Sequence, residues 1–118
     1  MKVEVLDSIG YSTPAMRGCC IVSGSHGGMS AARYAVDVRP ALVFFNDAGG
    51  GKDDAGTAGV AWLESQGIAA ATVGHDTARI GDARSTLDSG VISRVNQQAA
   101  ALGVAVGMTC GDAVALMR

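Results

Sequence analysis

Four short apolar runs predict strands in this chain. The first, residues 2–6, alternates polar and apolar side chains, which is typical of a half-exposed strand at a sheet edge. The other three are continuously apolar, as strands buried on both faces of a sheet usually are. They cover residues 18–23, 42–45 and 68–73.

The segments between these runs favour helices. Residues 29–38 supply apolar positions with helical spacing, and Pro40 blocks any continuation. A second helix is expected up to residue 66. Asp53 and Asp54 would lie at its N-terminus, where the helix dipole favours negative charge, and Gly67 would cap its C-terminus.

The last third of the chain predicts two more helices. One covers residues 89–102, and the other covers residues 112–117. Thr109 and Asp112 have the spacing of a capping box that would open the final helix. Residues 78–88 show no clear period and are left unassigned.

Strands that alternate with helices predict a single three-layer α/β domain over residues 1–118, with a mainly parallel sheet of about four strands. In such a sheet every loop from a strand into a helix leaves from the carboxyl edge, where ligand sites lie. Three loops should therefore converge there: residues 24–28, 46–54 and 74–76. They bring four candidate side chains to that edge: His26, Asp47, His75 and Asp76.

Composition narrows the possible partners. The net charge is −2 and the sequence pI is near 5.5, which argues against nucleic acid as the main partner. No apolar segment is long enough to span a membrane and no signal-peptide core is visible, so a cytoplasmic location is expected. Aromatic residues are only 4% of the chain. A core of small side chains suggests either modest intrinsic stability or stabilisation by an oligomer interface, and a homo-oligomer is expected.

The three cysteines, Cys19, Cys20 and Cys110, are expected to be free thiols. Cys19 and Cys20 lie in a predicted strand and should be buried and unreactive. The sequence predicts no cofactor.

A metal site is also not predicted, although one group of side chains leaves the question open. Asn46, Asp47, Asp53 and Asp54 carry oxygen ligands that Mg²⁺ accepts. Carboxylates this close to a helix start are more often caps.

His26 and Asp47 are the predicted catalytic pair. A neutral imidazole beside a carboxylate is the usual arrangement of a general base, because the carboxylate fixes the tautomer and supports the imidazolium. Asp47 ends the strand expected next to that of His26. The alternatives are that His26 binds ligand without chemistry, or that it only caps the following helix.

Two glycine-rich loops, GSHGG and AGGGKDD, could hold an anion on their N–H groups. Neither matches a phosphate-binding P-loop or a dinucleotide fingerprint. Arg79 and Arg84 could add bidentate contacts to carboxylate or phosphate, or could simply pair with aspartates on a surface loop. Lys52 could neutralise a carboxylate or phosphate, or could lie in a solvated turn. The predicted ligand-binding residues are Gly27, Gly28, Asn46, Gly49, Gly50, Gly51, Lys52, His75, Arg79 and Arg84.

The order strand–SHG–helix, strand–NDAGGG–helix and a further strand resembles the caspase–haemoglobinase fold, including metacaspase-like and CHAT-type peptidases. The resemblance covers roughly residues 18–73, and His26-Gly27 would correspond to the family's His-Gly. The family's nucleophilic cysteine would fall near Ala48, where this chain has no cysteine. The resemblance therefore supports strand order and the approach of His26 to the glycine loop, and it implies no peptidase activity.

Three functional hypotheses follow. The first is a small hydrolase-like enzyme for an acidic or amide substrate, with His26 as base, Asp47 orienting it and N–H groups of Gly49–Gly51 as an oxyanion site. Water would be its nucleophile, since Ser25 and Ser30 are weakly placed. The second is a non-catalytic module that binds a small anion or carboxylate. The third is a small subunit of a larger enzyme.

Overall fold

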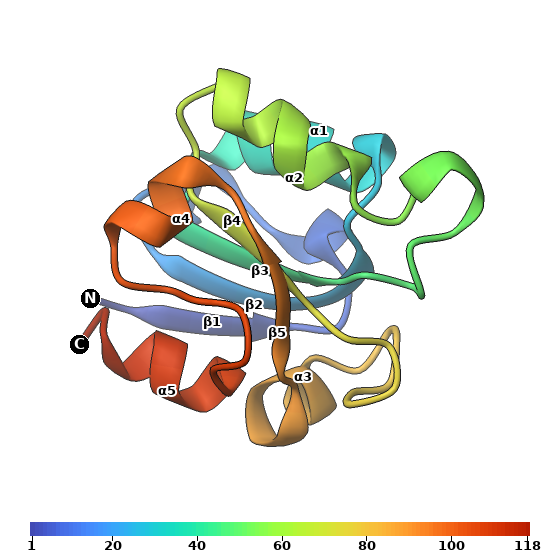
Figure 1. Ribbon diagram of the computed structural model, residues 1–118. Helices are drawn as coiled ribbons and strands as arrows, with labels where there is room; N and C mark the ends of the chain where they lie inside the picture. The colour runs from blue at the N-terminus through green and yellow to red at the C-terminus, as the bar shows by residue number, and fades with distance from the viewer.

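The computed structural model describes the backbone of residues 1–118 and every side chain except that of Asp53. A five-stranded sheet lies between two layers of helices (Figure 1). The strands follow one another in chain order across the sheet: β1 (Val3–Leu6), β2 (Cys20–His26), β3 (Leu42–Asn46), β4 (Ala70–Val73) and β5 (Ile92–Val95). The first four are parallel, and β5 is antiparallel to β4. The α/β class and the mainly parallel sheet are confirmed.

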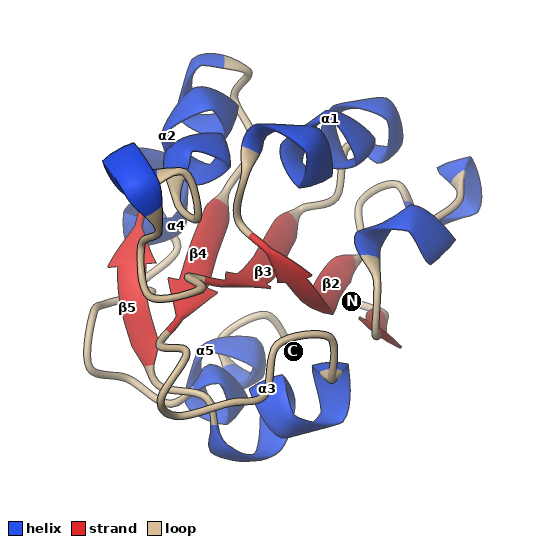
Figure 2. Ribbon diagram, turned by 90° about the vertical axis from the view of Figure 1, so that its right-hand side faces the viewer, coloured by secondary structure: helices blue, strands red, loops and turns tan.

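The helices divide between the two faces of the sheet (Figure 2). On one face lie α1 (Met29–Val38) and α2 (Ala58–Ser65), with 3-10 helix η1 (Ile9–Tyr11) packed against α1. On the other lie α3 (Ala83–Ser89) and α5 (Cys110–Ala115). Three shorter helices complete the fold: η2 (Pro14–Met16), η3 (Lys52–Asp54) and α4 (Gln97–Ala101).

Two apolar clusters, one on each face of the sheet, hold these layers together. Every residue of the central strand β3 is buried between them. Val43 and Phe45 point into the cluster under α1 and α2, whereas Leu42 and Phe44 point into the cluster over α5. Successive side chains of a strand alternate between faces, so a continuous apolar run is what a doubly covered strand requires.

Several local predictions are confirmed. Helix α1 has the predicted bounds and ends before Pro40, with Arg39 in a left-handed conformation. Gly67, at φ +75°, follows the end of α2, and Thr109 caps α5 by accepting from Asp112 N at 3.1 Å. The cysteines are free and buried. Burial raises the pKa of Cys20 to about 11 and that of Cys110 to about 12, which keeps both as unreactive thiols.

The helix predicted over residues 89–102 is wrong for its first part and holds only for Gln97–Ala101. This segment forms strand β5 and, after Asn96, the short helix α4. The β-branched residues Val91, Ile92 and Val95 suit a strand, and pairing with β4 satisfies backbone groups along an edge that would otherwise be open. Asn96 then ends the strand: its buried amide accepts from Ala70 N and Ala99 N and donates to Val60 and Ile68 carbonyls.

The start of the second helix is also corrected. Helix α2 begins at Ala58 with Thr57 at its N-cap, so Asp54 belongs to the separate 3-10 turn η3. The unassigned stretch 78–88 contains the loop into α3 and most of that helix. The N-cap of α3 is Asp82, which accepts from Ser85 N at 3.0 Å.

Among the residues that the structure describes, no helix is both long and apolar enough to cross a bilayer.

Candidate functional site

Three loops meet at the carboxyl edge of the sheet. In the strand register His26 is opposite Asn46, and Asn46 is opposite Val73, so β2, β3 and β4 end side by side. Strand β2 extends to His26, further than predicted. The convergence of the loops after these strands is therefore confirmed.

The edge has a switch point between β3 and β4. The loops after β2 and β3 lead to α1 and α2 on one face, whereas the loop after β4 leads to α3 on the opposite face (Figure 2). Loops that diverge in this way leave a crevice at the carboxyl ends of the two strands, which is where ligands bind in open α/β sheets. Asp47, directly after β3, and His75, two residues after β4, flank this switch point.

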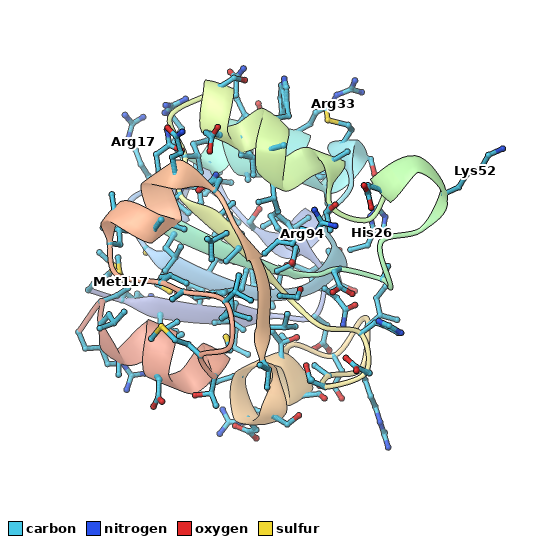
Figure 3. All side chains as sticks on the ribbon, viewed as in Figure 1. Arg17, His26, Arg33, Lys52, Arg94 and Met117 are labelled. Carbon is cyan, nitrogen blue, oxygen red and sulfur yellow. The ribbon has the colours of Figure 1, made fainter. Side chains whose placement is uncertain are left out.

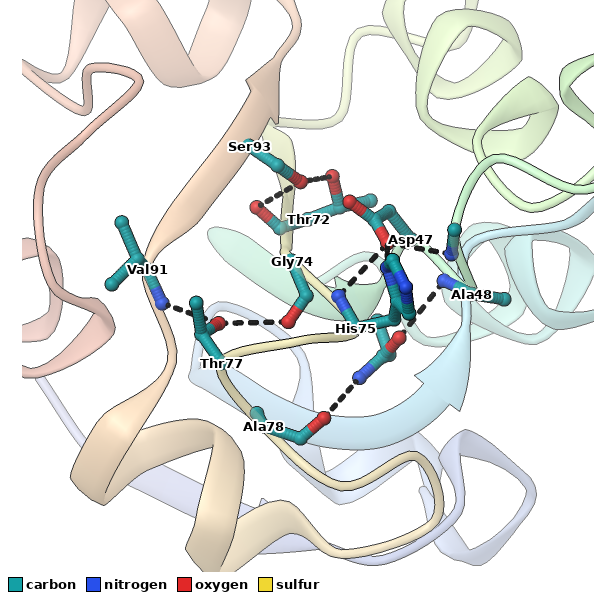
Figure 4. Close-up of polar contacts among 11 residues, drawn as sticks. Asp47, Ala48, Thr72, Gly74, His75, Thr77, Ala78, Val91 and Ser93 are labelled. Atoms are coloured by element: carbon teal, nitrogen blue, oxygen red, sulfur yellow. Dashed lines mark hydrogen bonds and ion pairs between the residues drawn. The ribbon is translucent and has the colours of Figure 1, made fainter.

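Asp47 is the polar centre of this switch point. Its Oδ1 accepts from Gly49 N at 2.8 Å and from His75 N at 3.0 Å, and it lies 3.4 Å from His75 Nδ1 (Figure 4). The Asp47 side chain is 15% exposed, whereas the His75 side chain is 60% exposed. A sheltered carboxylate thus holds an accessible imidazole.

The surroundings of Asp47 keep it ionised. Partial burial raises the pKa of its carboxyl, but this effect is outweighed by hydrogen bonds from Gly49 N–H, the Ser93 hydroxyl and His75 N–H, and by the charge of His75. The net result is a lowered pKa. Donors to the charged form and a nearby cation are the expected causes of such a shift.

Ser93 is a member of this site that the sequence did not predict, because it was assigned to a helix. In strand β5 its Oγ lies 2.9 Å from Thr72 Oγ1, next to the Asp47 carboxylate (Figure 4). The β-branched run around it was the signal that could have located it.

The glycine loop is shaped around the Asp47 backbone and side chain. Gly49, Gly50 and Gly51 have φ of +73°, +85° and +68°, a left-handed region in which other residues are strained. The N–H of Gly49 donates to the Asp47 carboxylate and that of Gly50 to the Asp47 carbonyl. In this structure both groups are engaged with Asp47, which differs from the oxyanion role expected for them.

His26 occupies a different position from the one predicted for a catalytic base. Its Nδ1 accepts from Gly28 N at 3.1 Å, whereas the imidazole beside Asp47 is that of His75. Pairing of His26 with Asp47 is thus replaced by pairing of His75 with Asp47. His26 opens instead onto a separate hollow of about 180 Å³ that it shares with Ser30 and Tyr34.

Other glycines and Asn46 have structural roles. A Cβ on Gly27 would lie 2.7 Å from Gly56 O, and one on Gly28 would meet the His26 ring, so both permit close packing of neighbouring loops. Asn46 is fully buried: it donates to Ala78 O at 3.0 Å and accepts from Ala48 N at 2.8 Å. It ties the glycine loop to the loop after β4.

A polar pocket of about 300 Å³ opens beside His75. It is lined by His75, Asp76, Thr77, Ala78, Arg79, Ser85 and Ser89. Ser85 Oγ accepts from Arg79 N at 3.0 Å, and Ser89 Oγ donates to Thr77 O at 2.8 Å, so its walls are held by hydrogen bonds. His75 and Arg79 were both predicted to bind ligand and do share this pocket.

Two predicted ligand residues lie away from it. Arg84 pairs with Asp88 along the outer side of α3, at 3.3 Å, with both side chains largely exposed. Lys52 projects away from the body of the protein (Figure 3). Both positions correspond to the surface alternative that the sequence left open.

The two carboxylates of the glycine loop that the structure describes, Asp47 and Asp54, face different partners. Asp47 faces His75, whereas Asp54 Oδ1 lies 3.6 Å from Arg94; the side chain of Asp53 lies outside the described part of the structure. Among the side chains that are described, no three His, Cys, Asp or Glu groups lie together as a metal site requires.

Comparison with protein-family models, with curated proteins and with solved structures finds no match to this chain. The resemblance to the caspase–haemoglobinase fold therefore stays a prediction, and function has to be argued from the site itself.

Proposed function

We propose that this protein is a small hydrolase-like enzyme in which His75 is the general base and Asp47 is the residue that orients it. The observation that carries this proposal is the Asp47 Oδ1–His75 Nδ1 contact of 3.4 Å, made by a sheltered, ionised carboxylate to an exposed ring. With Nδ1 facing Asp47, Nε2 is available to accept a proton from water. The resulting imidazolium is stabilised by the carboxylate.

The adjoining pocket supports a small, acidic or amide substrate. Arg79 lies in the same pocket as His75, and a guanidinium binds a carboxylate through paired hydrogen bonds. The hydroxyls of Ser85 and Ser89 are engaged in the pocket wall, which favours water over serine as the nucleophile. Ser25 accepts from Ile9 N, and Ser30 lies in the His26 hollow, so neither adjoins His75.

The test is hydrolysis of a panel of small amides, esters and phosphoesters that carry a carboxylate. We expect the H75Q variant to lose at least about 100-fold in kcat, the usual contribution of a general base. H26Q is the matched control and should retain activity, because His26 Nδ1 accepts from Gly28 N and pairs with no carboxylate among the described side chains. Absence of turnover by the unaltered protein over the whole panel, or full activity in H75Q, would refute the proposal.

The same pocket also supports the alternative of a non-catalytic carboxylate-binding module, since Arg79 and a protonated His75 both attract an anion. Titration of the panel compounds into the H75Q variant separates the two hypotheses. Retained affinity with lost turnover supports the enzyme, whereas weakened affinity without any turnover in the unaltered protein supports the binding module.

A further inference from the structure

A second pocket, away from His75, lies between α2 and β5. Its volume is about 310 Å³, which is at the small end of ligand sites. Its charged members are Arg94, Glu64 and Asp54, and its apolar members are Ala58, Val60, Ala61 and Val95. Figure 3 shows Arg94 rising from β5 toward the α2 side.

Glu64 is held in place by the neighbouring helix. Its Oε1 accepts from Gln97 N at 2.7 Å, at the start of α4, and its carbonyl accepts from Gln98 Nε2 at 3.0 Å. The carboxylate is therefore fixed on one oxygen, and a carboxylate can accept further bonds on the other. A side chain positioned in this way loses little entropy when it binds a ligand.

Arg94 is poised to exchange its partner. Its guanidinium is 3.6 Å from Asp54 Oδ1, and the two side chains are 55% and 67% exposed. A solvent-exposed pair at this distance contributes little stability, so an incoming carboxylate with two aligned oxygens can compete with Asp54. Asp54 would then be free to approach a cationic group.

The charges of this pocket restrict what it can bind. One guanidinium and two carboxylates disfavour phosphates and other multivalent anions, while a simple amine would leave Arg94 close to a second positive charge. A ligand that carries one carboxylate and one ammonium satisfies all three groups. The alanine and valine side chains of the lining suit a small apolar substituent between or beside these charges.

We infer that the α2–β5 pocket binds a small zwitterion of the α-amino-acid type. Arg94 takes the carboxylate, Glu64 and Asp54 take the ammonium, and the apolar lining takes the side chain. This site is separate from the proposed hydrolytic site, and its occupancy requires no chemistry at His75.

The test is a titration of the ¹⁵N-labelled full chain with L-alanine, L-valine and L-leucine, followed by amide chemical shifts. Saturable shifts are expected at Ala58, Ala61, Arg94 and Val95. L-valinamide lacks the carboxylate and N-acetyl-L-valine lacks the ammonium, so each should bind at least about tenfold more weakly than L-valine, because one charge-assisted contact is lost.

Two variants locate the site. R94Q and E64Q should each weaken L-valine binding at least about tenfold. Glutamine at position 64 can still accept from Gln97 N, so that variant removes the charge and keeps the fold contact. R84Q is the control, since Arg84 is also an exposed arginine paired with an aspartate.

Three results would overturn the inference: no saturable shift with any of the three amino acids, equal affinity for L-valinamide and L-valine, or unchanged affinity in R94Q. The readout is equilibrium binding on α2 and β5, so it remains decisive whether or not the protein hydrolyses anything. Failure here and failure of hydrolysis at His75 are therefore distinguishable.

Discussion

The two glycine-rich loops of this protein look alike in sequence and are built for different purposes. Residues 24–28 use glycine to bring backbones together: a Cβ at Gly24 or Gly27 would meet backbone atoms at 2.5–2.7 Å. Residues 49–51 use glycine for its left-handed conformations, which wrap two N–H groups around Asp47. The second loop surrounds a carboxylate with donors, whereas the first serves the packing of backbones. Glycine content alone therefore does not distinguish close packing of backbones from a left-handed conformation.

The largest expected effect separates these two uses of glycine. Gly27→Ala should lower the free energy of unfolding by about 2–3 kcal/mol, because the added methyl group overlaps Gly56 O and Thr72 Cγ2 in a buried region. Gly51→Ala should cost about 1–3 kcal/mol from backbone strain alone, because its φ of 68° and ψ of −175° lie in a region essentially restricted to glycine, while the nearest atom to its Cβ is 3.6 Å away. Urea denaturation at constant m-value measures both. A loss below about 1 kcal/mol in Gly27→Ala would contradict the close packing of the first loop.

The second prediction concerns the carboxylate that the second loop surrounds. Asp47→Asn keeps the shape of the side chain but removes the charge that its donors stabilise. We expect a loss of about 1–2 kcal/mol in unfolding free energy at neutral pH. The matched control is Asp88→Asn, which breaks only the exposed pair with Arg84 and should cost at most about 0.5 kcal/mol.

The difference in unfolding free energy between the unaltered protein and Asp47→Asn should shrink as the pH falls. Folding lowers the pKa of Asp47 below 3.8, so the stabilisation is present above that unfolded value. It is lost as the pH falls through the still lower folded pKa. Denaturation curves between about pH 7 and pH 2 should therefore converge for the two proteins in the acid range. A difference that is constant with pH would mean that the Asp47 charge is not stabilised by the fold.

The sequence predicted the scaffold of this edge better than the contacts on it. Continuous apolar runs located β2, β3 and β4, and the crossover rule brought His26, Asp47 and His75 to one edge. Which histidine meets Asp47 depends on local contacts: His26 Nδ1 accepts from Gly28 N, whereas Asp47 Oδ1 accepts from His75 N. The helix predicted over residues 89–102 hid β5, because a strand of four residues is too short to show a clear alternation next to the following helix. Ser93 was missed for the same reason, since its place beside Asp47 depends on β5 pairing with β4.

The smallest effect is spectroscopic and tests the two histidines directly. His26 Nδ1 accepts a backbone hydrogen bond from Gly28, so its neutral ring should carry its proton on Nε2. His75 Nδ1 faces the Asp47 carboxylate, so its neutral ring should carry the proton on Nδ1. Long-range ¹H–¹⁵N correlation spectra of the imidazoles distinguish these tautomers, and H26Q and H75Q assign the signals. In Asp47→Asn the His75 ring should lose its preference for the proton on Nδ1, while the tautomer of His26 should not change. If both rings carry their proton on Nε2, Asp47 does not orient His75, and the general-base arrangement loses its structural support.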